Sequence, residues 1–111
     1  MPVRFFHNDA RGLVCAPHLA EIGINLFNFS SEHSLTQIQK LAGDKVALLG
    51  NIPPRDVLAA GTPEQVSQGV RIMLSELEDR RRIIASCGGG VPPDVSTENI
   101  KAFVEAVRIN R

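Results

Sequence analysis

Short apolar runs alternate four times with stretches of helical periodicity along this chain. The runs cover residues 3–7, 24–29, 45–49 and 82–86, and they are nearly continuous in apolar side chains. Continuous runs of this length are typical of strands that are covered on both faces, as in a parallel sheet. The alternation therefore predicts an α/β fold in which each strand is followed by a helix and all strands run in one direction.

Helix signals occupy the segments between these runs. Pro17 is expected to open a short helix that ends at Gly23. Ser34 is expected to cap a second helix that ends at Gly43. Both glycines stand where a helix commonly ends in a left-handed residue, so the two helices are short and well bounded.

The two later helices follow longer connections. Pro53-Pro54 is expected to prevent an immediate helix and to leave a brief apolar turn at residues 56–60. Residues 62–65, Thr-Pro-Glu-Gln, have the pattern of a capping box with proline at the first position. Ser96 or Thr97 caps the last helix. The residues expected to face the core are Leu19 and Ile22, then Leu35, Ile38 and Leu41, then Val66, Val70, Met73, Leu74 and Leu77, and finally Ile100, Phe103, Val104 and Val107.

Four strand and helix units make half of an eight-stranded barrel. We therefore predict one domain, residues 1–111, with the fold of half a (β/α)8 TIM-type barrel built on a parallel sheet. A sheet of this kind leaves both edges unpaired and its inner face uncovered. The expected partner is a second copy that forms a homodimer, a different partner half-barrel, or further residues upstream of this chain.

Composition and charge narrow the function classes. The 111 residues are 43% hydrophobic and 22% charged, and twelve Lys and Arg balance twelve Asp and Glu. No overall positive field exists to attract nucleic acid, and no apolar run approaches the about 20 residues of a membrane helix. Cys15 and Cys87 lie far apart, and the N-terminus has no signal-peptide pattern. The expectation is a reduced, cytoplasmic protein without nucleic-acid or membrane partners.

Polar residues and glycines follow each strand and are expected at one edge of the sheet, where such folds carry their sites. His7 and Asp9 are the strongest candidate pair of functional residues, because alternate residues of a strand lie on the same side of it. They are candidate acid, base or metal-binding residues, and the alternative is that His7 only forms a hydrogen bond across the rim. The four strand ends are His7-Asn8-Asp9, Asn28-Phe29-Ser30, Gly50-Asn51 and Cys87-Gly88-Gly89-Gly90.

Three segments resemble the C-terminal half of the uroporphyrinogen decarboxylase family, which also contains methylcobamide-dependent methyltransferases. They are residues 6–9, residues 47–54, and Val-Pro-Pro at 91–93 through Glu98-Asn99. The resemblance implies a (β/α)8 barrel with a tetrapyrrole-related site at the strand C-termini. The His-Asn-Asp and Gly-Asn-Ile-Pro-Pro forms are closer to the methyltransferase-like members. The resemblance therefore implies corrinoid-linked methyl transfer. The alternatives are uroporphyrinogen decarboxylation in tetrapyrrole synthesis and a non-catalytic half-barrel.

The catalytic motifs of that family match only in part. In the zinc methyltransferases a His-x-Cys and a later Cys bind the metal, whereas here His7 matches the histidine, Asp9 replaces the first cysteine and Gly89 the second. Cys87 stands two residues early, and the histidine that decarboxylases carry near Gly89 is absent. The acidic catalytic residues of the decarboxylases come from the N-terminal half. The candidate zinc ligands are His7, Asp9 and Cys87, with His33 and Glu32 as weaker candidates, and Cys87 is alternatively a small buried hydrophobe.

The remaining rim residues are candidates for binding a tetrapyrrole-type or methylated small-molecule ligand. The glycine loop precedes a capped helix, so its backbone N–H groups are suited to a carboxylate or phosphate, and the alternative is a tight turn of the rim. The polar side chains are suited to acidic groups of a ligand, and the alternative is that each caps the backbone. The candidate binding residues are Asn28, Ser30, Asn51, Arg55, Gly88, Gly89 and Gly90.

Overall fold

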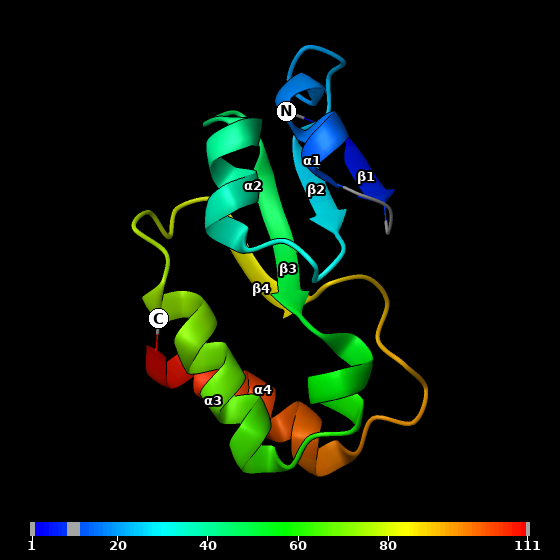
Figure 1. Ribbon diagram of the computed structural model, residues 1–111, viewed down its shortest axis with the longest axis vertical. Coiled ribbons are helices and arrows are strands. Elements are labelled where there is room, and N and C mark those ends of the chain that lie inside the picture. Colours follow the sequence, from blue (N-terminus) through cyan, green and yellow to red (C-terminus); the bar gives the residue numbers. More distant parts are fainter. Residues whose placement is uncertain (1, 9–11, 111) are drawn as a thin grey trace.

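A computed structural model describes residues 2–8 and 12–110 of the chain (Figure 1). Its strands form one parallel sheet in the order β1-β2-β3-β4, which confirms the predicted alternation and direction. Each strand begins one or two residues later than the apolar run suggests, and all but β2 also end later, because pairing with the neighbouring strand sets their bounds. They are β1 (Phe5–Asn8), β2 (Leu26–Phe29), β3 (Ala47–Ile52) and β4 (Ile83–Cys87).

Helical segments connect the strands. The capping box at Thr62 is confirmed, and Ser34 and Ser96 each accept a backbone N–H three residues on, as helix caps do. Among the described residues no helix has the length and apolar character needed to cross a membrane. The segments are α1 (Gly12–Cys15), η1 (Ala16–His18), α2 (Leu35–Ala42), η2 (Pro54–Ala59), α3 (Pro63–Ser75) and α4 (Thr97–Asn110).

Two helix predictions were wrong. No regular helix runs from Pro17 to Gly23; α1 and the single 3-10 turn of η1 precede a turn that leaves Ile22 66% exposed. After β3, helical structure starts at once, because Pro54 occupies the first turn of η2, where a backbone N–H has no helical partner. Gly23 has the predicted left-handed conformation, with a φ of 91°, but it ends a turn and not a helix.

The sheet has one covered face and one open face. Phe27 and Phe29 are fully buried against the residues of α1 and α2, and Leu48 and Ile52 of β3 lie on the same side. The other side carries the in-register row His7, Asn28, Leu49 and Ile84. Ile84 is 49% exposed, and Phe5, one layer below, is 51% exposed. The open face is the side that would line the interior of a closed barrel.

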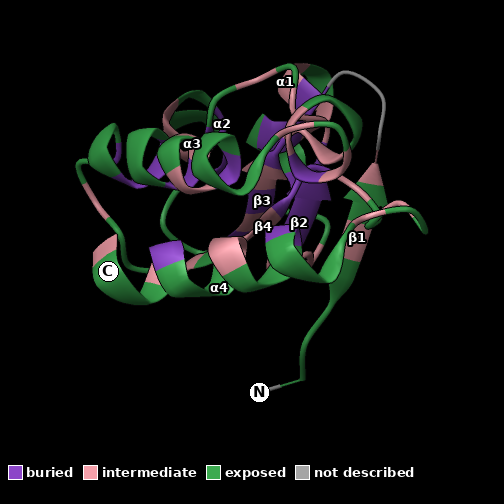
Figure 2. Cartoon of the chain, turned by 90° about the horizontal axis from the view of Figure 1, so that it is seen from below, coloured by how far each residue is buried: buried purple, intermediate pink, exposed green. Residues whose placement is uncertain are grey.

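The last helix turns a different side to the core than predicted. In Figure 2, α1, α2 and α3 lie above the strands and α4 lies below them, and α4 contacts α3 and η2. Phe103 and Val107 are partly buried as expected, but Ile100 and Val104 are 45% and 50% exposed. The buried positions of α4 are Asn99 and Ala106, because this helix packs mainly against α3 and η2. In α2, likewise, Ala42 is buried and Leu41 is exposed.

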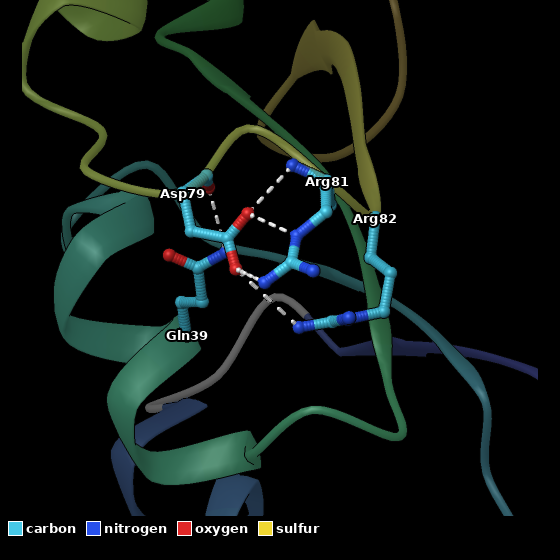
Figure 3. Close-up of polar contacts among 4 residues, drawn as sticks. All are labelled: Gln39, Asp79, Arg81 and Arg82. Atoms are coloured by element: carbon cyan, nitrogen blue, oxygen red, sulfur yellow. Dashed lines mark hydrogen bonds and ion pairs between the residues drawn. The ribbon is translucent and has the colours of Figure 1, made fainter.

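An ion-pair cluster closes the loop that leads into β4, at the end of the sheet opposite the strand C-termini (Figure 3). The Asp79 carboxylate accepts hydrogen bonds from the backbone N–H, Nε and Nη2 of Arg81 at 2.9, 3.0 and 3.0 Å, and Arg82 Nη2 lies 3.7 Å away. Gln39 of α2 donates to the Asp79 carbonyl oxygen at 3.0 Å. Arg81 and Arg82 of the basic run at residues 80–82 therefore help to hold this loop in place.

The cluster makes stability depend on acid pH. Hydrogen bonds from Arg81 lower the pKa of Asp79 from 3.8 to about 2. A carboxyl with a lowered pKa in the folded state stabilises the fold above its ordinary pKa, and that contribution is lost as pH falls from about 4 to about 2. We expect Asp79→Asn to lower the denaturant midpoint at pH 7 and to reduce its decline across this window. Glu78→Gln, at an exposed neighbour, is the control; an unchanged decline in Asp79→Asn would contradict the assignment.

Candidate functional site

The best-defined polar contact at the strand C-termini joins β1 to β2. His7 and Asn28 are paired in the parallel register, and His7 Nδ1 lies 2.7 Å from Asn28 Oδ1. His7 is exposed on the open face, whereas Asn28 is 3% exposed beneath it. The His7 ring is therefore exposed to solvent and is held by the buried side chain of Asn28. This is the arrangement expected of a group that contacts a ligand.

Asn28 also ties β2 to the next two strands. Its Nδ2 donates to the carbonyl oxygens of Leu49 at 2.6 Å and of Cys87 at 3.3 Å. One side chain thus links the C-terminal ends of all the strands in the described sheet. A substrate-binding role for Asn28 stays a prediction, while the contacts that the structure shows are with the protein.

The predicted partner of His7, Asp9, lies outside the described residues. Its pairing with His7 therefore stays a prediction. His7 and Asn8 each make a further interaction. What the structure establishes is the position of His7, in register with Asn28 at the C-terminal ends of the strands. This end of the sheet is called the mouth below.

The glycine loop after β4 packs closely on the loop after β2. The Gly88 N–H donates to the Ile52 carbonyl at 2.9 Å, and a Cβ at Gly88 would lie 2.6 Å from Ser31 N. Gly89 has a left-handed φ of 102°, and Gly90 faces open space. The first glycine thus allows close backbone approach, the second a turn, and Gly90 is the member with room for a ligand.

Cys87 lies on the opposite side of the sheet from His7. It is 2% exposed in the hydrophobic core, in register with Ile52. Its Sγ donates to the Gly89 carbonyl oxygen at 3.1 Å, and burial raises the pKa of the Cys87 thiol. A buried thiol with a raised pKa is a weak nucleophile and a weak metal ligand. The structure does not bring Cys87 and His7 together.

The other candidate metal ligands are also apart. Among residues 2–8 and 12–110, no three His, Cys, Asp or Glu side chains gather so that they could hold a metal ion. His33, in the loop after β2, has a buried Nε2 without a hydrogen-bond partner, and Glu32 beside it is exposed. The donors in the described part of the chain therefore do not fit a zinc site, which normally takes three or four protein ligands.

The side chains of Ser30 and Asn51 at the rim bond to backbone, as in the capping alternative to ligand binding. Ser30 Oγ accepts the Glu32 N–H at 3.3 Å. Asn51 Nδ2 donates to the carbonyl oxygen of His33, and the Asn51 N–H points to Met73 Sδ at 3.2 Å. Both residues therefore shape the loop after β2 at the edge of the mouth.

A cavity of about 690 Å³ opens between η2 and the loop after β4. It brings together Arg55 and Gly90, two of the predicted binding residues. In the described part of the chain no hydrogen bond or ion pair engages the Arg55 guanidinium, which is exposed. The cavity is lined by Pro54, Arg55, Ala59, Ala60, Gly90, Pro92, Pro93 and Asp94.

Asn99 is a residue whose role sequence reasoning missed. It is 3% exposed, and its Nδ2 donates to the Leu58 and Gly61 carbonyl oxygens at 2.8 Å each. These bonds fix η2 against α4 and so hold one wall of the cavity. A polar residue in the first turn of a helix was the available signal, but its partners lie about forty residues away.

Comparison with known proteins places this arrangement in a family. The profile of the uroporphyrinogen decarboxylase (URO-D) family matches residues 1–109. The uroporphyrinogen decarboxylase of Vesicomyosocius okutanii is 34% identical over 81% of this chain and 26% of its own length. That of Pseudoalteromonas translucida is 32% identical over 96% of this chain and 29% of its own length. The chain thus spans less than a third of the length of each of these two relatives.

A solved structure shares the fold. A methyltransferase from Methanosarcina mazei superposes with a TM-score of 0.82 and 20% identity, over 96% of this chain and 31% of the other. The match supports the predicted half of a TIM-type barrel. Its low identity restricts the comparison to the fold.

Proposed function

Because this chain belongs to the uroporphyrinogen decarboxylase (URO-D) family, we propose that it forms one half of the mouth of a methyltransferase active site. The methyl donor in this proposal is a corrinoid-type compound and the acceptor is a small-molecule thiol. The observation that carries the proposal is His7, exposed at the strand C-termini and supported from below by buried Asn28. Strand C-termini are where barrels of this class carry catalytic side chains.

His7 has a defined task in such a reaction. The thiol must lose its proton before its sulfur attacks the methyl carbon, and the electron pair of the broken bond stays with the donor. An imidazole at the mouth takes that proton as a general base. General-base catalysis raises the reaction rate by about 10²–10⁴-fold. No zinc-dependent step is included, because the described donors do not fit a zinc site.

Arg55 is assigned to ligand binding. Its guanidinium has the free donors and the adjoining cavity needed to engage a carboxylate or amide oxygen on the edge of a large ligand. Corrinoids and tetrapyrroles both carry such groups around their rings. The chemistry of this subsite is therefore compatible with the methyl donor proposed.

The mouth needs a second half. Both β1 and β4 are edge strands of the described sheet, and Phe5 and Ile84 are half exposed on its open face. A second copy, related by a two-fold axis along the barrel, would place its β1 beside β4 and its β4 beside β1, all parallel. Closure of this kind buries the open face and removes both edges. A second copy of the chain is the partner proposed.

Uroporphyrinogen decarboxylation is the second candidate function, because the curated relatives at 29–34% identity carry that name. It requires acidic catalytic residues that the family resemblance places in the N-terminal half. The third candidate is a non-catalytic role, in which the half-barrel only pairs with a partner.

Mixing the chain with methylcobalamin and a thiol separates these functions. We expect a loss of the methylcobalamin absorbance spectrum that depends on both the protein and the thiol. In a parallel reaction, product analysis with uroporphyrinogen tests the second candidate. Decarboxylated products with an unchanged methylcobalamin spectrum would replace the first function by the second, and inactivity of the assembled protein in both reactions would favour the non-catalytic module.

A further inference from the structure

The cavity between η2 and the loop after β4 is lined by one residue of each charge. Of the described residues that line it, only Arg55 of η2 and Asp94 of the loop are charged, and the rest are proline, alanine and glycine. Both charged residues are exposed, and both segments follow the C-terminal end of a strand. The cavity therefore lies at the mouth and carries no net charge.

The two charges are available to a ligand. Within residues 2–8 and 12–110, neither the Arg55 guanidinium nor the Asp94 carboxylate forms an ion pair, with the other or with a third group. A guanidinium only donates hydrogen bonds, and an ionised carboxylate only accepts them. The cavity thus presents donors from one wall and acceptors from the other.

Contacts within the protein hold these walls in place. The buried Asn99 side chain bonds to the carbonyl oxygens of Leu58 and Gly61, at the C-terminal end of η2 and just beyond it, at 2.8 Å each. Pro54 in one wall and Pro92 and Pro93 in the other have φ fixed by their rings. A site held in this way loses little conformational freedom when a ligand binds.

The charges favour one kind of polar group over another. A carboxylate in this cavity is attracted by Arg55 and repelled by Asp94, so the two effects oppose each other. A primary amide offers its oxygen to Arg55 and its NH2 group to Asp94, and it carries no net charge. The side chains around a corrinoid ring end mostly in primary amides, whereas those around uroporphyrinogen end in carboxylates.

We infer that Arg55 and Asp94 form a subsite for the primary amide side chains of a corrinoid, and that Asp94 disfavours carboxylates at the same positions. The identity of the ligand rests on the proposed function. The pair acts in binding, at the edge of the ring, and takes no part in the transfer of the methyl group. It also separates the proposed methyl donor from the substrate of the second candidate function.

Two corrinoids that share a ring and a cobalt ion test the inference on the assembled protein. Dicyanocobinamide carries amide side chains, and dicyanocobyrinic acid carries carboxylates in their place. The visible absorbance of both allows equilibrium dialysis at pH 7, where the carboxylates are ionised. We expect the wild-type protein to bind the amide form more tightly. The ratio of the two dissociation constants is the quantity to compare between variants, because it cancels differences in the folded fraction.

Substitutions at the two charged positions should change that ratio in different ways. Asp94→Asn should tighten binding of the acid by about two- to fivefold, the effect of one exposed charge pair, and change binding of the amide less. Arg55→Gln should weaken binding of the amide by about tenfold or more, because a hydrogen bond to a charged donor is lost. Asp56→Asn is the control: it removes the same charge beside Arg55, but Asp56 is exposed and lines a different cavity.

The outcomes separate this inference from the proposed function when methylcobalamin consumption is measured on the same preparations. Equal binding of the two corrinoids, or an Asp94→Asn ratio no different from that of Asp56→Asn, would overturn the inference even if methyl transfer proceeds. Failure of both corrinoids to bind would also overturn it. The expected selectivity in a protein that transfers no methyl group would refute the proposed function and leave the amide subsite standing.

Discussion

Replacing Gly88 by alanine is expected to lower the free energy of unfolding by about 1–3 kcal/mol, the usual cost of overpacking a tight site. The added Cβ would lie 2.6 Å from Ser31 N and 3.0 Å from the Phe29 carbonyl oxygen. Both contacts are with backbone, which cannot rotate away as a flexible side chain can. The added Cβ would push the loop after β4 away from the loop after β2. Urea unfolding followed by circular dichroism measures the change in the free energy of unfolding.

Gly90→Ala is the matched control for that experiment. Gly90 stands two residues later in the same loop, and a Cβ there would meet nothing within 4 Å. Neither glycine has a positive φ, so the pair differs in available space and not in backbone strain. We expect Gly90→Ala to change stability little. Equal destabilisation by the two variants would show that the close approach at Gly88 is not what this loop requires.

His7→Ala is expected to reduce methyl transfer by about 10²–10⁴-fold, the range for loss of a general base. His7 is exposed on the open face, so the variant should fold and keep the wild-type circular dichroism spectrum, although loss of the contact with Asn28 should lower the denaturant midpoint slightly. The rate of methylcobalamin absorbance loss in the presence of thiol is the measurement. The effect should appear in kcat, because the lost proton transfer belongs to the reaction and not to ligand binding.

His18→Ala is the control for the activity measurement. His18 is 63% exposed and pairs with Glu21 within one turn, away from the strand C-termini. An exposed pair of this kind contributes little to stability, and the variant should match wild type in rate. A His7→Ala protein with the wild-type rate would remove His7 from the mechanism.

Local sequence signals determined the elements that were predicted correctly. The parallel strands follow from apolar runs, and the starts of α2 and α3 follow from caps that bond within three residues of themselves. Predictions failed where packing decides. Ile100 and Val104 have helical spacing with Phe103, yet α4 buries Asn99 and Ala106 because it contacts α3 and η2.

The sequence predicted where the candidate site lies, but it did not predict which residues in the site contact one another. The parallel topology alone places His7, Asn28, Asn51 and the glycine loop at one edge, and the structure has them there. The contacts of Asn28 join residues 21 and 59 positions apart, and no local pattern encodes such distances. The side of the sheet that Cys87 faces likewise depends on strand register, because a shift of one residue would turn its side chain to the other face.

We propose that this chain is half of a barrel whose mouth is completed by a second copy. Light scattering across a dilution series measures the mass in solution and tests that claim most directly. We expect twice the 12.1 kDa of one chain, with dissociation only at low concentration. A single-chain mass at every concentration, together with binding of hydrophobic dyes, would contradict it and would mean that the open face of the sheet is completed by something other than a second copy.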